Sequence, residues 1–338
     1  MQDILTNAMN YAAGLDSVSY ADSRTITSKN TSMGVSTKEE AAQSGEYFGI
    51  SVRVLAKGAW GYSSAQSAER SALNKAVDAA RKCALAVAAT KKEKIVIDAQ
   101  KPMHDKVQVL GKESLFDMSF EEQRKLLHEM LDFAKSKTIV FAQGGISASK
   151  SEKVFANTEG SILETTIERT RIGMTCVARD ASKQAMNYDV SAAQGGLEKV
   201  MQQGIEKFST EVSKKATLFL SAKPPHAGKT QVLMSPQVAG TLVHEVFGHA
   251  VEADWIANGR SLLAKKLNQK MASDTVTIYD DGSIPGAWGS VYYDDEGIKS
   301  KKNILLENGV LKQYMHSRES AKKLSMPITG NGRLQDHT

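Results

Sequence analysis

Polar and apolar residues alternate in two stretches of the chain, residues 17–63 and about 137–190, and a helical pattern follows each of them. Alternation with a period of two is typical of half-buried β-strands. We therefore expect three or four antiparallel strands in the first stretch. The second stretch contains three further strand candidates, Val154–Asn157, Ile162–Ile167 and Ile172–Arg179.

Helical periodicity predicts four helices in the same part of the chain. The first covers Met1–Leu15, where apolar residues recur at helical spacing and no signal-peptide pattern is present. An alanine-rich helix is expected over residues 64–90, and a third helix begins at Ser119, which forms a capping box with Glu122. The fourth covers about 195–217. Strand–strand–helix units thus occur twice, which predicts an α+β fold.

The proline-containing stretch Lys223–His226 resembles a linker. We expect an N-terminal α+β domain at residues 1–222 and a β-rich C-terminal domain at residues 223–338. Strand candidates in the second domain are Thr275–Tyr279, Ser290–Tyr293, Asn303–Glu307 and Val310–Tyr314. Asn308-Gly309 between the last two strands is a typical type I′ hairpin sequence.

One motif in the second domain carries clear chemistry: His244-Glu245-Val246-Phe247-Gly248-His249, followed by Glu252. Two neutral imidazoles bind Zn²⁺ at about 2.0–2.1 Å, and a neighbouring carboxylate can take a proton from water that the metal activates. This combination is that of a zinc hydrolase. On these six residues alone, ordinary surface or core positions are an equally good interpretation.

The sequence around the motif favours the metal interpretation. We expect a short strand at Thr230–Met234 and a helix that starts at Ser235-Pro236, with serine as N-cap and proline in the first turn. Apolar residues at helical spacing predict a buried helix face: Val238, Leu242, Val246 and Val251. His244 would then lie in a buried helix, where a polar side chain needs a partner.

The two histidines are five positions apart, whereas the common H-E-x-x-H motif places them four apart. On a regular helix, positions i and i+5 diverge by about 140°, too far for two imidazoles to share one ion. A single π-helical turn would absorb the extra residue, and such turns are frequent at functional sites. We therefore predict a widened turn at Val246–His249, with Gly248 as a place where the backbone can deform.

Composition narrows the function classes. The net charge of +5 is small for 338 residues, and aromatic residues make up only 6% of the chain, so a nucleic-acid interface is not expected. The two cysteines, Cys83 and Cys176, lie in apolar stretches and are expected in the core, which favours a reducing compartment. No apolar run is long enough to span a membrane. We expect a cytoplasmic protein without membrane contact.

Two other motifs predict turns rather than ligand sites. Asp280–Gly282 and Asp294–Gly297 are acidic, but neither has the spacing of an EF-hand loop, so a plain turn is favoured over calcium binding. Gly228-Lys229-Thr230 resembles the end of a P-loop, but Lys223 stands where the first glycine is required. His104 and His128 have no partner spacing and are expected to be exposed.

Four blocks of the sequence together resemble the TldD/PmbA family, on the TldD side. They are the histidine motif with Glu252, the acidic turn at Asp294–Gly297, the hairpin at Leu306–Leu311, and Thr329–Arg333. The resemblance implies a zinc-dependent peptidase that acts on unfolded or extended peptides and pairs with a PmbA/TldE-like subunit or with itself. It implies that His244 and His249 are metal ligands and that Glu245 is the general base.

The resemblance also implies two further features. Glu252 matches a family position and is expected to orient a histidine through its free ring nitrogen. In TldD-like proteins a cysteine in the C-terminal part supplies the third zinc ligand, and neither Cys83 nor Cys176 matches it. We therefore expect the third ligand beyond Thr338, a truncated chain, and a weak or empty metal site in residues 1–338. A peptide-binding or scaffolding subunit with a vestigial metal motif is the alternative function.

Overall fold

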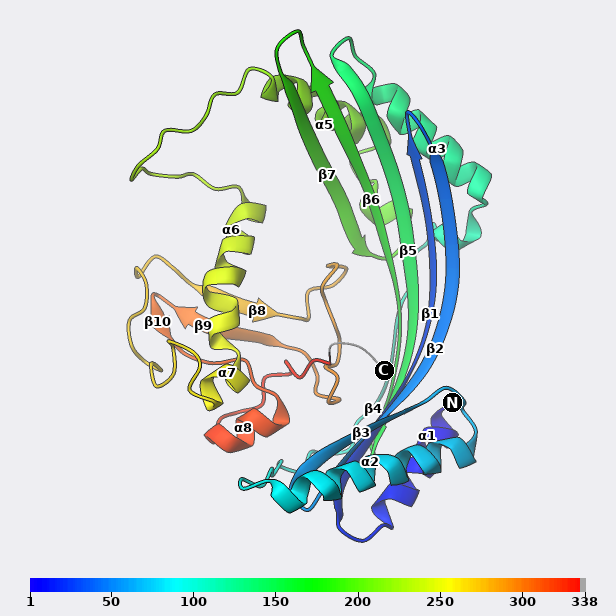
Figure 1. Cartoon of the computed structure of the whole chain (residues 1–338), viewed down its shortest axis with the longest axis vertical. Helices are drawn as coiled ribbons and strands as arrows, with labels where there is room; N and C mark the ends of the chain where they lie inside the picture. The colour runs from blue at the N-terminus through cyan, green and yellow to red at the C-terminus, as the bar shows by residue number, and fades with distance from the viewer. Residues whose placement is uncertain (335–338) are drawn as a thin grey trace.

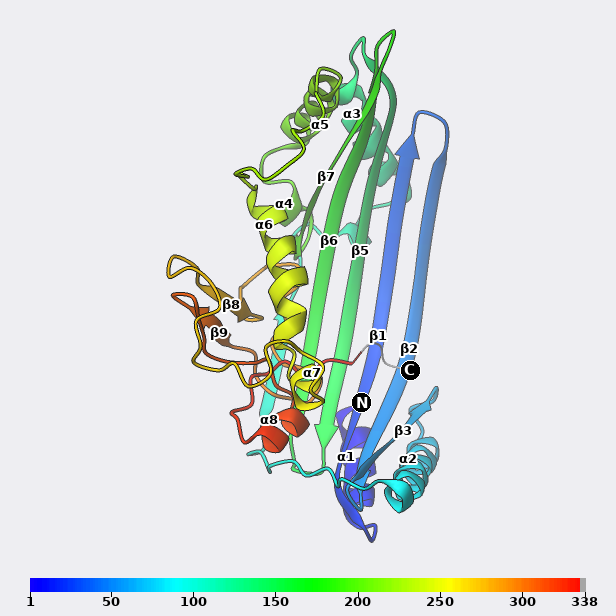
Figure 2. The same ribbon diagram turned by 60° about the vertical axis from the view of Figure 1, so that its left-hand side comes forward.

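The protein is described by a computed structural model, which defines residues 1–334. A long curved sheet with helices on it forms the N-terminal part, and a smaller unit with a three-stranded sheet lies on the concave side of the curve (Figure 1). Figure 2 shows the same arrangement turned by 60°, and Figure 1 shows the helix α6 (Pro236–Val243) apart from the large sheet. The predicted α+β fold class is confirmed.

The large sheet has seven strands in the order β3-β2-β1-β5-β6-β4, and β7 also pairs with β6. All of its pairings are antiparallel except the one between β4 and β6, which is parallel. The strands are β1 (Val18–Ser36), β2 (Glu40–Ala56), β3 (Ala59–Ala65), β4 (His104–Val109), β5 (Ile139–Asn157), β6 (Ile162–Arg179) and β7 (Gln184–Gln194). Three or four antiparallel strands were expected between residues 17 and 63, and three are present, β1, β2 and β3. The parallel strand β4 was not predicted.

Helices pack on one face of this sheet in two groups, one at each end (Figure 1). The helices are α1 (Gln2–Ala13), α2 (Arg70–Thr90), η1 (Leu115–Asp117), α3 (Phe120–Ala134), α4 (Leu197–Val200) and α5 (Ile205–Phe219). The capping box of Ser119 and Glu122 is confirmed at the start of α3. Even-numbered residues of β5, such as Ala142, Ile146 and Ala156, are buried under these helices. Because side chains alternate along a strand, the odd-numbered residues of β5 face the C-terminal unit.

The C-terminal unit contains short elements around a small core. They are α6, η2 (His244–Gly248), η3 (His249–Val251), α7 (Ala253–Ala257), β8 (Ile278–Asp281), β9 (Lys302–Glu307), β10 (Val310–Leu311) and α8 (Arg318–Leu324). Asn308 and Gly309 join β9 to β10 with φ angles of 48° and 76°. Both values are positive, as a type I′ turn requires, so the hairpin prediction is confirmed.

Buried ion pairs join the C-terminal unit to the large sheet. The Arg53 guanidinium lies 2.6 Å from Asp22 and 3.1 Å from Glu296, and it stacks on the Trp60 ring at 4.2 Å. The other carboxylate oxygen of Glu296 accepts a hydrogen bond from the Arg318 backbone N–H at the start of α8.

The Arg318 side chain extends this contact. It is 1% exposed, lies 2.6 Å from Glu159, and its guanidinium carbon is 4.5 Å from the Tyr20 ring centre. Buried charges are tolerated when they are paired and hydrogen-bonded. This contact therefore holds the C-terminal unit at a defined position on the sheet.

Several local predictions are wrong. Thr230–Met234 and Ser290–Tyr293 are not strands, and the second segment contributes only an isolated bridge between Tyr293 and Lys299. The helix expected over residues 195–217 is broken between α4 and α5, where Gly204 adopts a φ of 79°. Cys83 is exposed on α2, whereas Cys176 is buried as expected and burial raises the pKa of its thiol to about 11.

Within residues 1–334, no helix has the length and apolar character needed to cross a bilayer.

Candidate metal centre

The motif helix α6 begins as the sequence predicts but is not buried. The Ser235 hydroxyl accepts a hydrogen bond from the Val238 N–H, and Pro236 occupies the first turn. No residue of α6 is buried, and Val238 and Val246 are 56% and 69% exposed. In the described part of the chain no element packs over this helix, so the predicted core face is wrong except at Val251, which is fully buried.

This exposure removes one argument for a metal. His244 and Glu245 are exposed, so the histidine does not need a buried partner. The case for a metal therefore depends on how the two imidazoles are placed relative to each other.

The widened turn is confirmed. Residues His244–Gly248 form a π-helical turn, η2, which continues directly into the 3-10 turn η3. The centres of the His244 and His249 rings lie 4.6 Å apart, with the ring planes at 69°. A regular helix would separate these positions by about 140°, so the π turn is what brings the two imidazoles together.

Gly248 is not needed for its conformational freedom. Its φ and ψ angles are −54° and −55°, which any residue adopts in a helix. A methyl group at this position would lie 3.6 Å from Nδ1 of His244, an ordinary van der Waals contact. The backbone widens without a glycine-specific conformation, contrary to the role predicted for Gly248.

Glu252 holds the second histidine in place. Its Oε1 atom lies 2.7 Å from Nδ1 of His249. An ionised carboxylate only accepts hydrogen bonds, so Nδ1 carries the proton and the lone pair of His249 is on Nε2. A carboxylate behind a histidine is the usual partner that orients a metal-binding imidazole.

The described residues bring two candidate metal ligands together, His244 and His249. Across residues 1–334, no group of three or more His, Cys, Asp and Glu side chains is placed to hold one ion. The neighbouring imidazoles of His244 and His249 are suited to bind one metal ion, and Glu245 directly follows His244 in the sequence. Their roles as ligands and base remain predictions.

The two acidic stretches of the C-terminal unit, Asp280–Gly282 and Asp294–Gly297, lie at turns, as expected. One Asp294 carboxylate oxygen accepts hydrogen bonds from the N–H groups of Glu296 and Ile298, and the other accepts from Gly332. Asp281 accepts from the backbone and side chain of Ser283. These carboxylates are occupied by the local backbone and side chains.

If His249 binds a metal, replacing Glu252 by alanine should weaken zinc affinity by about 10–100-fold, because the imidazole loses the group that fixes its tautomer and orientation. Competition against a fluorescent zinc chelator would measure this change. Asp254→Ala, which removes an exposed acid two residues further along, is the matched control. Equal affinities for the two variants would contradict the role of Glu252.

Most of the chain matches one known family. Three family profiles match it: the PmbA/TldA metallopeptidase domain 1 at residues 39–84, the central domain at residues 113–218, and the C-terminal domain at residues 227–338. A metalloprotease of Methanocaldococcus jannaschii is 32% identical over 94% of this chain and 69% of its own length. A metalloprotease of Methanothermobacter thermautotrophicus is 34% identical over the same shares.

Solved structures share the fold. A putative modulator of a DNA gyrase from Thermotoga maritima superposes with a TM-score of 0.82 at 20% identity, covering 99% of this chain and 75% of that one. TldE from Thermococcus kodakarensis superposes with a TM-score of 0.74 at the same identity and coverage. Fold and sequence together define a member of a metalloprotease family. The chain belongs to the PmbA/TldD family.

Proposed function

We propose that this chain is the metal-bearing part of a zinc-dependent peptidase that cleaves unfolded or extended peptides. The observation that carries the proposal is the π turn, which places the His244 and His249 rings 4.6 Å apart despite their five-residue spacing. The family to which residues 227–338 belong is one of metallopeptidases. A relative from Saccharolobus solfataricus that is named a zinc metalloprotease TldD homolog is 37% identical over 35% of this chain, which supports zinc as the metal.

His244 and His249 would hold the metal, together with a third protein ligand from outside residues 1–334. Bound Zn²⁺ supplies a Lewis acid that polarises a peptide carbonyl and lowers the pKa of water towards about 7. Glu245 would accept the proton of the attacking water and deliver it to the leaving amine. Glu252 would keep Nε2 of His249 available by holding the proton on Nδ1.

An extended peptide would bind as an added strand. β8 is an outer strand of the three-stranded sheet, which lies in the same unit as the histidines, whereas the outer side of β10 is already paired with residues 268–271. Main-chain hydrogen bonds to such an edge give affinity with little dependence on side chains, as a peptidase for unfolded chains requires. A PmbA/TldE-like subunit or a second copy of this chain is the proposed partner. We propose that the protein acts in the cytoplasm.

The metal dependence of cleavage tests the proposal. A flexible peptide should be cleaved by the protein together with its partner, activity should disappear with a chelator, and added zinc should restore it. His244→Asn and His249→Asn should each lose both zinc and cleavage. Cleavage that persists after the chelator would contradict a metallopeptidase. Peptide binding without cleavage by the complete assembly would favour the scaffold alternative.

A further inference from the structure

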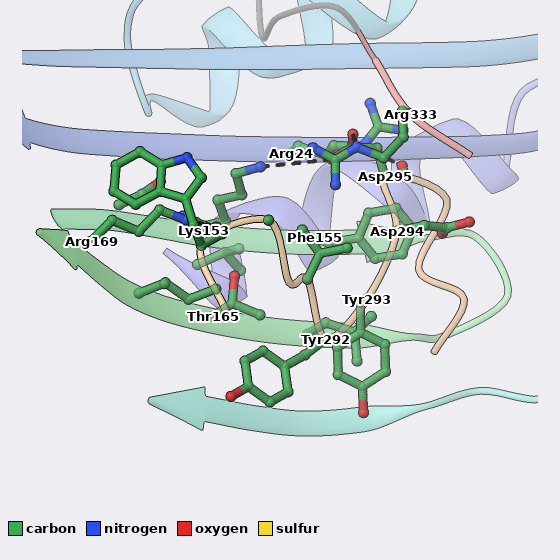
Figure 3. Close-up of a pocket in the computed structure, with 17 residues that line it drawn as sticks. Arg24, Lys153, Phe155, Thr165, Arg169, Tyr292, Tyr293, Asp294, Asp295 and Arg333 are labelled. Atoms are coloured by element: carbon green, nitrogen blue, oxygen red, sulfur yellow. Dashed lines mark hydrogen bonds and ion pairs between the residues drawn. The ribbon is translucent and has the colours of Figure 1, made fainter. Parts of the chain in front are cut away.

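A cavity of about 320 Å³ lies between the large sheet and the segment 288–295 (Figure 3). Neither histidine nor Glu245 is among its lining residues. Pockets that bind small molecules have volumes of about 300–1,000 Å³, so the cavity has the size of a small ligand site.

The floor of the cavity is the sheet face opposite the helices. Alternate residues of β5 and β6 line it, and the strand register places Lys153 beside Thr165 and Phe155 beside Leu163. Side chains at these positions share one face because they alternate along each strand. Arg24 on β1 lies beside Phe155, with its guanidinium carbon 5.7 Å from the ring centre.

Positive charge exceeds negative charge inside the cavity. Arg24, Lys153 and Arg333 lie together near Asp295 in Figure 3. The Lys153 ammonium and the Arg333 guanidinium are 3.8 Å and 3.4 Å from the Asp295 carboxylate, so two cations share one anion without a hydrogen bond. Arg24 donates to the Asp295 backbone carbonyl, and its charge is balanced by Asp22 at 2.8 Å, so it does not compete for the Asp295 carboxylate.

Arg169 is a further cation of the cavity, and its hydrogen-bond partners are uncharged. Its hydrogen bonds are to the backbone carbonyls of Trp288 and Ser290, at 3.0 and 3.1 Å. Among the described residues it has no carboxylate within ion-pair distance. Asp294 does not compensate, since its carboxylate points away from the cavity in Figure 3 and burial raises its pKa to about 7.

These cations also repel one another. Burial lowers the pKa of Lys153, and Arg333, Arg169 and Arg24 lower it further, while Asp295 opposes the change. Burial lowers the pKa of Arg169 as well, with a contribution from Arg333. A bound anion would relieve this repulsion, since an opposite charge nearby favours the charged form of each cation.

The remaining walls are apolar or aromatic. Phe155, Ile167, Val291 and Tyr292 line the cavity beside the cations. The Ser151 hydroxyl also lines it, and this buried oxygen has no hydrogen-bond partner in the structure. Buried hydroxyl groups are normally satisfied, so Ser151 is available to a ligand.

We propose that this cavity binds a small organic carboxylate with an aromatic or aliphatic body. The carboxylate would lie between Lys153 and Arg169, the apolar body would pack on Phe155 and Tyr292, and Ser151 would hydrogen-bond the ligand. Either a free acid or the C-terminal residue of a peptide presents this chemistry. The site is independent of the proposed peptidase centre.

Calorimetric titration of the chain with N-acetyl-L-phenylalanine tests the site. This acid should bind, and N-acetyl-L-phenylalaninamide, which lacks the charge, should bind at least about tenfold more weakly, because charge-assisted hydrogen bonds are lost. Lys153→Met should weaken binding of the acid by a similar factor. Lys150→Met, which removes the same charge from the opposite face of β5, should leave affinity within about twofold.

A longer peptide that ends in phenylalanine separates the two sources of carboxylate. Binding equal to that of the small acid means that the site accepts peptide C-termini, and loss of binding means that it accepts only small acids. The proposal is overturned if the acid and the amide bind equally, if neither binds up to about 10 mM, or if inorganic phosphate binds in place of the acid. The acid–amide comparison uses the unmodified chain, so it holds even if Lys153→Met fails to fold.

Discussion

Replacing Glu245 by glutamine should lower the rate of peptide cleavage by about 10²–10⁴-fold, because the amide cannot accept a proton from water. Folding should be almost unchanged, since Glu245 is exposed on the π turn and the substitution keeps its size. Zinc affinity should also be retained, because the two imidazoles are untouched. Peptide cleavage, zinc binding and thermal unfolding should be measured on the same preparation.

Zinc binding and peptide cleavage, measured together, distinguish a residue that acts as the base from a residue that binds the metal. His249→Asn should lose zinc and cleavage together, whereas Glu245→Gln should lose cleavage alone. Wild-type turnover in Glu245→Gln would show that another group acts as base. Loss of zinc in that variant would mean that Glu245 holds the metal or the π turn.

Replacing Arg53 by methionine should destabilise the protein by about 3–5 kcal/mol, because the buried Glu296 loses its paired cation and the buried Asp22 keeps only Arg24, 2.8 Å away. Asp22 is completely buried, and Glu296 is 6% exposed. Although burial lowers the pKa of Arg53, Asp22 and Glu296 outweigh it and hold that pKa well above its usual value. Denaturant unfolding followed by circular dichroism would measure the loss of stability.

Arg124→Met is the matched control. Arg124 lies 2.7 Å from Glu40, but both side chains are largely exposed, and such pairs contribute little. The Arg53 variant should also loosen α8, because Glu296 binds the start of that helix. If Arg53→Met is no less stable than Arg124→Met, the buried pairs do not hold the two units together.

Local patterns in the sequence predicted local structure well. Alternation located the long strands, and Ser119 with Glu122 located the start of α3. The π turn could be predicted because it depends only on the angle between positions 244 and 249. The hairpin at Asn308-Gly309 likewise depends on two residues alone.

Predictions that depend on distant partners were less successful. Val238 and Val246 have helical spacing, but spacing cannot show whether another element covers them, and both are exposed. The strand β4 pairs with β6, which lies more than fifty residues further along, and its six residues carry no distinctive pattern. The cationic cavity is formed by the register between β5 and β6 together with the position of the segment 288–295. The sequence alone therefore does not show that Lys153 and Arg169 line the same site.

The π turn has a consequence for how metal motifs are searched for in genomes. A pattern with a fixed four-residue spacing would reject this chain, although its two rings lie 4.6 Å apart. One inserted codon in a four-residue motif would produce such a turn, since a π turn accommodates a single extra residue. Without Val246 the two histidines would stand four positions apart, as in the fixed pattern. Searches that allow one insertion between the histidines, followed by a carboxylate three residues later, should find centres that the fixed pattern overlooks.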